Sequence, residues 1–112
     1  MANILEKIIQ DKKETLNLIK KNNSLDSLEK KIKSLNFFNN FKKTIQNNKG
    51  ISLISEIKKA SPSAGNLVKN FNHLDIAKMY IDNGSTCLSV LTEEKHFLGK
   101  LDYITDIKNK FK

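Results

Sequence analysis

The sequence predicts an α/β fold in which a helical segment precedes two strand–helix units. Apolar residues in the first part of the chain recur at the three- and four-residue spacing of helices. Two short β-branched runs follow, at residues 51–58 and 86–91, and each precedes a stretch with helical spacing. Alternating strands and helices are typical of parallel sheets, whose strands are joined by right-handed crossovers.

Three helices are expected in residues 1–49. The first begins after Asn3, which forms a capping pair with Glu6, and runs to about residue 21. Ser24 can cap a second helix. No candidate catalytic cluster is found in this part of the chain. A third, shorter helix is expected to carry Phe37, Phe38, Phe41 and Ile45.

Residues 50–112 are expected to contain the two strand–helix units. Pro62 and Gly65 break the loop of the first unit. His73 begins the helix of that unit and is interpreted, like His96, as a surface residue. The expected order is a strand at 51–58, a loop at 61–72, a helix at 73–83, a strand at 86–91 and a helix at 101–111.

Glu56 and Lys58 end the first predicted strand. Because side chains alternate along a strand, the two lie on the same face. The carboxyl ends of strands carry the chemistry of open α/β sheets and of (β/α)8 barrels. A lysine beside a carboxylate keeps its charge, so it suits binding a carboxylate or phosphate, or delivering a proton. The alternative is an ion pair at a strand end that has no role in function.

The loops that follow the two strands hold further candidates. The hydroxyl of Ser61 could bind an anion, or it could belong to an ordinary Ser-Pro-Ser turn. In the second loop, Phe97 could stack on a planar substrate, or it could anchor the loop to the core. Gly99 in the same loop allows a close approach of the backbone.

The motifs EIKKASPS, residues 56–63, and CLSVLTEEKHFLG, residues 87–99, resemble those of indole-3-glycerol-phosphate synthase. The N-terminal segment MANILEKIIQDKKE is also similar to the first helix of that family. The resemblance implies a partial TIM (β/α)8 barrel, with an N-terminal helical extension at 1–49 and the first two βα units at 50–112. A complete barrel takes roughly 250 residues. We therefore expect an N-terminal fragment of the enzyme that is inactive alone.

The resemblance also implies a reaction and site residues. The family is a carboxy-lyase of tryptophan biosynthesis, and it closes, decarboxylates and dehydrates carboxyphenylamino-deoxyribulose 5-phosphate without a metal or organic cofactor. By resemblance, Lys58 contacts the anionic substrate and assists proton transfer, while Glu56 positions that lysine. Ser61 is a substrate-side residue, although the family often has lysine where this chain has Ala64. Phe97 lies against the aromatic part of the substrate. The principal acid, the base and most of the phosphate site are expected beyond Lys112.

Composition leaves two other interpretations open. The formal net charge of +8 is compatible with a small basic module that binds nucleic acid. However, the lysines are spread over every segment, so we interpret them as solvated and expect no nucleic-acid partner. A separate chain that supplies the missing strands of a split barrel is the other possibility, because exposed strand edges invite pairing.

The cysteine count and hydropathy predict where the protein is found. Cys87 is the only cysteine of the sequence, so no disulfide can form within the chain, and a cytoplasmic location is expected. No apolar stretch approaches the roughly 18 residues of a membrane span, and no signal peptide is recognised, so no membrane partner is expected.

Overall fold

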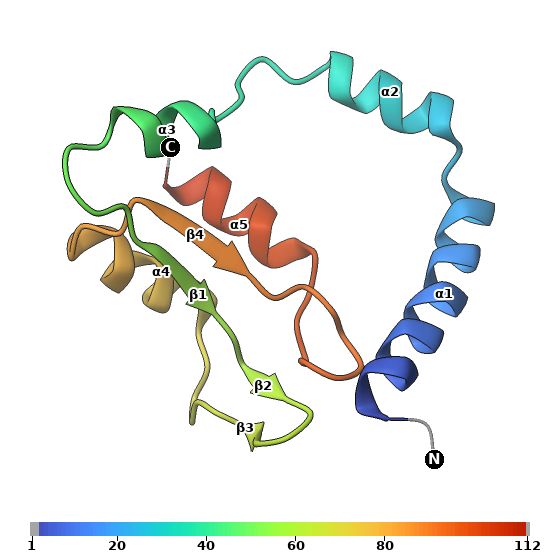
Figure 1. Cartoon of the computed structure of the whole chain (residues 1–112). Coiled ribbons are helices and arrows are strands. Elements are labelled where there is room, and N and C mark those ends of the chain that lie inside the picture. Colours follow the sequence, from blue (N-terminus) through green and yellow to red (C-terminus); the bar gives the residue numbers. More distant parts are fainter. Residues whose placement is uncertain (1–2, 112) are drawn as a thin grey trace. The chain divides into compact units, whose positions relative to one another are not determined.

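A computed structural model describes residues 3–111, which form a mixed α/β structure (Figure 1). The chain divides into two compact units, Met1–Asn39 and Asn40–Lys112. The first unit contains α1 (Ile4–Asn22) and α2 (Leu25–Lys33). The second contains α3 (Phe41–Asn47) together with the strands and the remaining helices.

Local capping fixes the helices of the first unit. The Asn3 side chain accepts a hydrogen bond from the Glu6 backbone N–H at 2.9 Å, and the Glu6 carboxylate accepts from the Asn3 backbone N–H at 3.1 Å. Ser24 caps α2 by accepting from the Ser27 N–H at 3.1 Å. Both predicted caps are therefore confirmed. Neither helix buries a residue, so the amphipathic pattern that predicted these helices does not correspond to a core within this unit.

The third helix is shorter than the sequence suggested. The Asn40 side chain accepts from the Lys43 N–H at 2.9 Å, which makes Asn40 the N-cap and starts α3 at Phe41. The prediction that Phe37 and Phe38 belong to this helix is wrong, because both precede the cap in irregular backbone. Apolar spacing continued across this boundary, whereas the hydrogen bonding of the asparagine decides where the helix begins.

Two parallel strands, β1 (Ile54–Ile57) and β4 (Cys87–Val90), form the central sheet. Ile54 pairs with Cys87 and Ile57 with Val90, so the predicted parallel pairing is confirmed. Both strands are shorter than predicted. At the start of β1, the Asn48 side chain donates to the backbone oxygen of Ile51 at 3.1 Å, which ties that stretch to the end of α3 instead of to the sheet.

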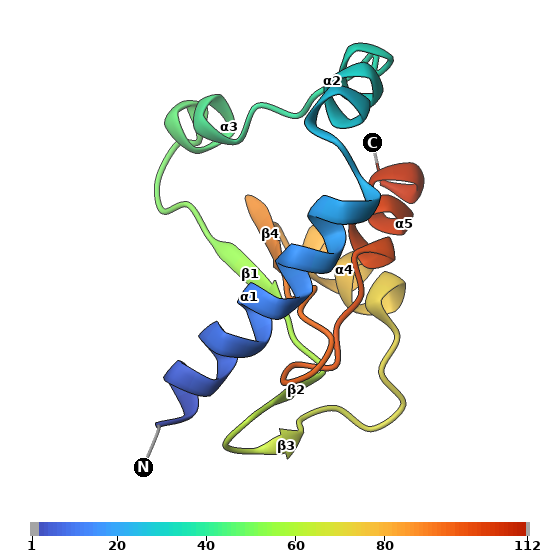
Figure 2. The same ribbon diagram turned by 90° about the vertical axis from the view of Figure 1, so that its right-hand side faces the viewer.

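Helices α4 (His73–Asp82) and α5 (Asp102–Lys110) lie on the same side of this sheet (Figure 2). Ile57, Ala77 and Ile107 form the buried cluster, and Ile57 is 1% exposed. The neighbouring positions of β1, Ile54 and Glu56, are exposed. Strand alternation therefore turns Ile57 toward the helices and the other two residues toward the uncovered face.

A second, antiparallel pairing lies in the loop after β1. It joins β2 (Ala60–Ser61) to β3 (Gly65–Asn66) across a turn that contains Pro62. Gly65 has a φ of 64°, in the left-handed region that favours glycine. The sequence predicted a broken loop here but not this pairing, because two-residue strands carry no recognisable alternation.

His73 is more than a surface residue, and that interpretation is wrong. Its ring stacks on Tyr103 with 4.3 Å between the centroids, and its Nε2 lies 2.8 Å from the Asp106 carboxylate. Only 18% of the side chain is exposed. Because Tyr103 and Asp106 are three residues apart, they lie on the same side of α5, and His73 joins α4 to that side.

Candidate active site

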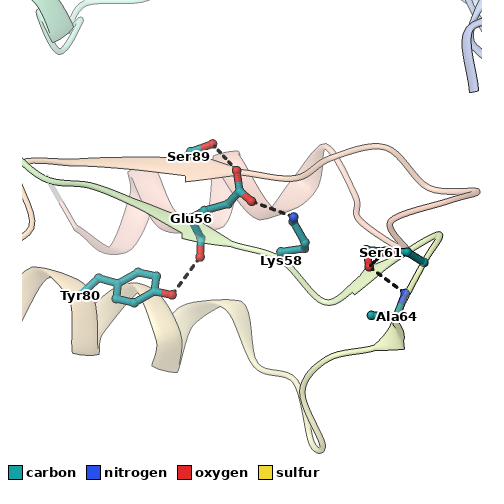
Figure 3. A network of polar contacts seen from close by, with 7 residues as sticks. Glu56, Lys58, Ser61, Ala64, Tyr80 and Ser89 are labelled. Carbon is teal, nitrogen blue, oxygen red and sulfur yellow. Dashed lines mark hydrogen bonds and ion pairs between the residues drawn. The ribbon is translucent and has the colours of Figure 1, made fainter. Parts of the chain in front are cut away.

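Glu56 and Lys58 meet at the C-terminal end of β1 (Figure 3). The Lys58 ammonium Nζ lies 3.1 Å from the Glu56 Oε1, and the two side chains are 32% and 47% exposed, respectively. The predicted common face is therefore confirmed. An ion pair this exposed contributes only about 0–1 kcal/mol to stability. Its main consequence is geometric, because the carboxylate holds the ammonium in one place at the strand end.

Two neighbouring elements support Glu56. The parallel register places Ser89 of β4 opposite Glu56, and the Ser89 hydroxyl donates to the Glu56 Oε2 in a long contact of 3.4 Å. From α4, the Tyr80 hydroxyl donates to the backbone oxygen of Glu56 at 2.9 Å (Figure 3). Neither contact could be identified from the sequence, because both depend on how the elements pack.

Phe97 reaches the same site from the loop after β4. The Lys58 Nζ lies over the Phe97 ring, 5.9 Å from its centroid. A cation at this separation is attracted to the face of the ring by about 0.5–1 kcal/mol at an exposed position. Glu56 and Phe97, which are far apart in the sequence, therefore both contact the Lys58 ammonium. The aromatic ring and the positive charge lie next to each other at the carboxyl ends of the strands.

Ser61 makes its hydrogen bonds within its own turn. Its hydroxyl accepts from the Ala64 N–H at 3.2 Å (Figure 3). The same hydroxyl lies 3.5 Å from the Ser63 hydroxyl. These contacts account for the shape of the turn between β2 and β3. In the described part of the chain, the hydrogen bonds of Ser61 do not connect it to Glu56 or Lys58.

The loop that carries Phe97 is closed by a contact that only glycine permits. A β carbon on Gly99 would lie 2.1 Å from the backbone oxygen of Leu91, far inside any tolerated contact. The predicted close approach at Gly99 is therefore confirmed. The Gly99 N–H also donates to the backbone oxygen of Glu93 at 2.8 Å. The sequence did not single out Glu93, whose side chain also organises this loop.

The sequence model of a protein family, described as indole-3-glycerol phosphate synthase, matches residues 5–112 of the chain. The chain belongs to the indole-3-glycerol phosphate synthase family. The match covers both the helical first unit and the strand–helix units, so it includes Glu56, Lys58, Ser61 and Phe97.

Individual synthase sequences agree with this assignment. The chain is 45% identical to the indole-3-glycerol phosphate synthase of Desulforamulus reducens over 107 residues, which make up 96% of this chain and 40% of that protein. It is 43% identical to the synthase of Aliarcobacter butzleri, covering 95% of this chain and 41% of that protein. A protein named "Tryptophan biosynthesis protein TrpCF" from Buchnera aphidicola is 41% identical and is covered to 23%. The chain thus spans about 40% of the length of the synthases that it matches.

The described residues contain neither a metal-binding cluster nor a membrane-spanning helix. Within residues 3–111, no three His, Cys, Asp or Glu side chains are grouped so that they could share a metal ion. None of the described helices is both long enough and apolar enough to cross a membrane. The candidate site that the geometry favours is the Glu56–Lys58 ion pair with the Phe97 ring beside it.

Proposed function

We propose that these residues contribute the first part of the active site of an indole-3-glycerol phosphate synthase. The proposed reaction converts carboxyphenylamino-deoxyribulose 5-phosphate into indole-3-glycerol phosphate, carbon dioxide and water, as a step of tryptophan biosynthesis. Membership of the family supports this activity. The observation that assigns this activity to particular residues is that Glu56, Lys58 and Phe97 lie together at the carboxyl ends of two parallel strands.

The proposed architecture is a TIM (β/α)8 barrel of which this chain supplies the beginning. Residues 1–49 are proposed as a helical extension and residues 50–112 as the first two βα units. Barrel enzymes have their active sites at the carboxyl ends of the strands, which is where the ion pair lies. In such a barrel the uncovered sheet face, with Glu56 on it, turns toward the interior, while α4 and α5 form part of the outer ring.

Each candidate residue has a defined role in this proposal. The Lys58 ammonium binds an anionic group of the substrate and assists proton transfer, and Glu56 holds it in position at 3.1 Å. The Phe97 ring lies against the aromatic ring of the substrate, and Ser61 shapes the substrate side of the first loop. The principal acid, the base for dehydration and most of the phosphate site are proposed to lie on later βα units, in line with the resemblance.

The proposed reaction is balanced by proton transfers and by the release of carbon dioxide and water, so the residues are assigned no redox role. In line with the family resemblance, we propose no metal or organic cofactor. A reducing cytoplasm is the proposed location, since Cys87 is the single cysteine of the chain and small proteins of oxidising compartments usually depend on disulfides.

A partner chain that completes the barrel is the second candidate arrangement. The central sheet has two strands, β1 and β4, so each has one edge without a neighbouring strand among the described residues. Such edges bind further strands readily. In this arrangement the 112-residue polypeptide purifies with a second chain of barrel-completing size, and a polypeptide that purifies alone from its native cell counts against it.

The activity is tested with a chimera in which these 112 residues are followed by the remaining length of the Desulforamulus reducens synthase. We expect the chimera to form indole-3-glycerol phosphate, followed by indole fluorescence, and the 112-residue polypeptide alone to show no turnover. Circular dichroism of both proteins serves as the control for folding. Turnover by the polypeptide alone would contradict the proposal, and so would a folded chimera that is inactive.

A further inference from the structure

The loop between β4 and α5 is organised around the side chain of Glu93. Its Oε1 accepts a hydrogen bond from the Lys95 N–H at 3.1 Å. Its Oε2 accepts from the N–H groups of His96 at 2.7 Å and Phe97 at 3.0 Å. Hydrogen bonds to a charged acceptor are about twice as strong as neutral ones. One carboxylate therefore fixes the three successive peptide groups that lead to the Phe97 side chain.

The backbone closes the same loop from the other side. The Gly99 N–H donates to the backbone oxygen of Glu93 at 2.8 Å, and Gly99 packs directly against the backbone of Leu91. Between these contacts, Leu98 has a φ of 52°, in the left-handed region that costs a side-chain-bearing residue roughly 1–2 kcal/mol. A conformation of this kind persists only where surrounding contacts hold it. The Glu93 carboxylate supplies those contacts on the side of the loop that carries Phe97.

We propose that Glu93 is a positioning residue that holds the Phe97 ring against the Lys58 ammonium. The connection runs from the Glu93 carboxylate to the Phe97 N–H at 3.0 Å, and from the Phe97 ring to the Lys58 Nζ at 5.9 Å. Glu93 acts on the lysine through the ring, because its carboxylate accepts hydrogen bonds from the backbone of the loop that carries Phe97. The geometry of the loop is independent of the proposed function, whereas the importance of Glu93 for the reaction rests on that function.

The number of accepting oxygens explains why a glutamate suits this position. A carboxylate accepts at both oxygens, so it can bind all three N–H groups. Glutamine has a single accepting oxygen, and its amide N–H₂ group would face the donor of Lys95. Aspartate keeps both oxygens on a shorter side chain, and aspartate commonly caps N–H groups two and three residues ahead. We therefore expect the loop to be most ordered with glutamate at position 93, less ordered with aspartate, still less with glutamine, and least with alanine.

The test is the NMR resonance of the Lys58 ε-protons in the 112-residue chain, because an aromatic ring beneath them shifts it upfield. Phe97→Leu removes the ring and defines the unshifted position. We expect Glu93→Ala to remove the upfield shift as Phe97→Leu does, and Glu93→Asp to restore part of it. Glu94→Ala is the matched control, since it removes the same charge from the next position, and the shift should remain.

Three results would overturn the proposal. The first is an upfield shift of Lys58 that survives Glu93→Ala. The second is a wild-type resonance that Phe97→Leu leaves unchanged, which would show that the ring and the ammonium do not meet. The third applies if Glu93→Ala unfolds the chain: the milder Glu93→Gln should then reduce the shift, and an unchanged shift in that variant contradicts the inference.

Kinetics of the chimera separate this inference from the proposed function. We expect Glu93→Ala to lower kcat/KM by as much as Phe97→Leu. The double variant should have the same kcat/KM as Phe97→Leu alone, because both changes remove the same contact, that of the Phe97 ring with the Lys58 ammonium. If the losses in kcat/KM of the two single variants add in the double variant, Glu93 does not act through Phe97. An inactive wild-type chimera would defeat the proposed function, while the Lys58 resonance would still decide whether Glu93 positions the ring.

Discussion

Replacing Lys58 by methionine in the chimera is expected to lower kcat/KM by about 10²–10⁴-fold, the range for loss of a group that transfers a proton. Methionine keeps the apolar stem of the side chain and removes the ammonium. Glu56 would then face the substrate without its cation, so a carboxylate would oppose an anionic ligand instead of a charge pair receiving it. The rate is measured from indole fluorescence at several substrate concentrations.

Lys59→Met is the matched control for this experiment. Lys59 follows Lys58 directly, in the bend beyond the end of β1, and it lines an open concavity with Leu67 and Phe71. The same loss of charge there should leave kcat/KM close to that of the unsubstituted chimera. Equal losses for the two variants would show that overall charge, and not the placement of one ammonium at the strand end, attracts the substrate.

Replacing Ile57 by alanine is expected to destabilise the second unit by about 2–5 kcal/mol, the usual cost of removing a fully buried large aliphatic side chain. Ile57 is 1% exposed and forms the buried cluster with Ala77 and Ile107. Because that cluster is small, few other side chains can move to fill the cavity. The free energy of unfolding in urea, followed by circular dichroism, measures the loss.

Ile54→Ala provides the comparison within the same strand. Ile54 is 49% exposed and lies on the face that the helices do not cover. Its truncation in the 112-residue chain should cost about 1 kcal/mol, because half of the side chain already contacts water. If the two alanine variants lose equal stability, the assignment of Ile57 to the helix-covered face is wrong.

The parts of the fold that could be predicted are those determined by neighbouring residues. The caps at Asn3 and Ser24 are bonds between residues three positions apart, so the sequence pattern shows them directly. The parallel pairing of the strands followed from the helix between them. The start of β1 could not be predicted, because it depends on the side-chain contact of Asn48 with Ile51, whose alternatives have similar spacing. Phe37 and Phe38 were misassigned for the same reason.

The candidate site was predictable in part. Alternation alone placed Glu56 and Lys58 on one face. Phe97 was a candidate from its place in the second loop and from the family resemblance, but no spacing rule brings residue 97 close to residue 58. The supporting contacts of Ser89 and Tyr80 require the register of the sheet and the packing of α4. Glu93 was missed because, unlike Asn3 and Ser24, it precedes a turn and no regular helix, so no helical apolar spacing marks it as a cap.

A crystal structure of the chimera with indole-3-glycerol phosphate bound tests the central claim most directly. We predict that the Lys58 Nζ lies within hydrogen-bond distance of a ligand oxygen and that the Phe97 ring packs against the indole ring. A ligand held elsewhere, with the Glu56–Lys58 pair turned into solvent, would contradict the account.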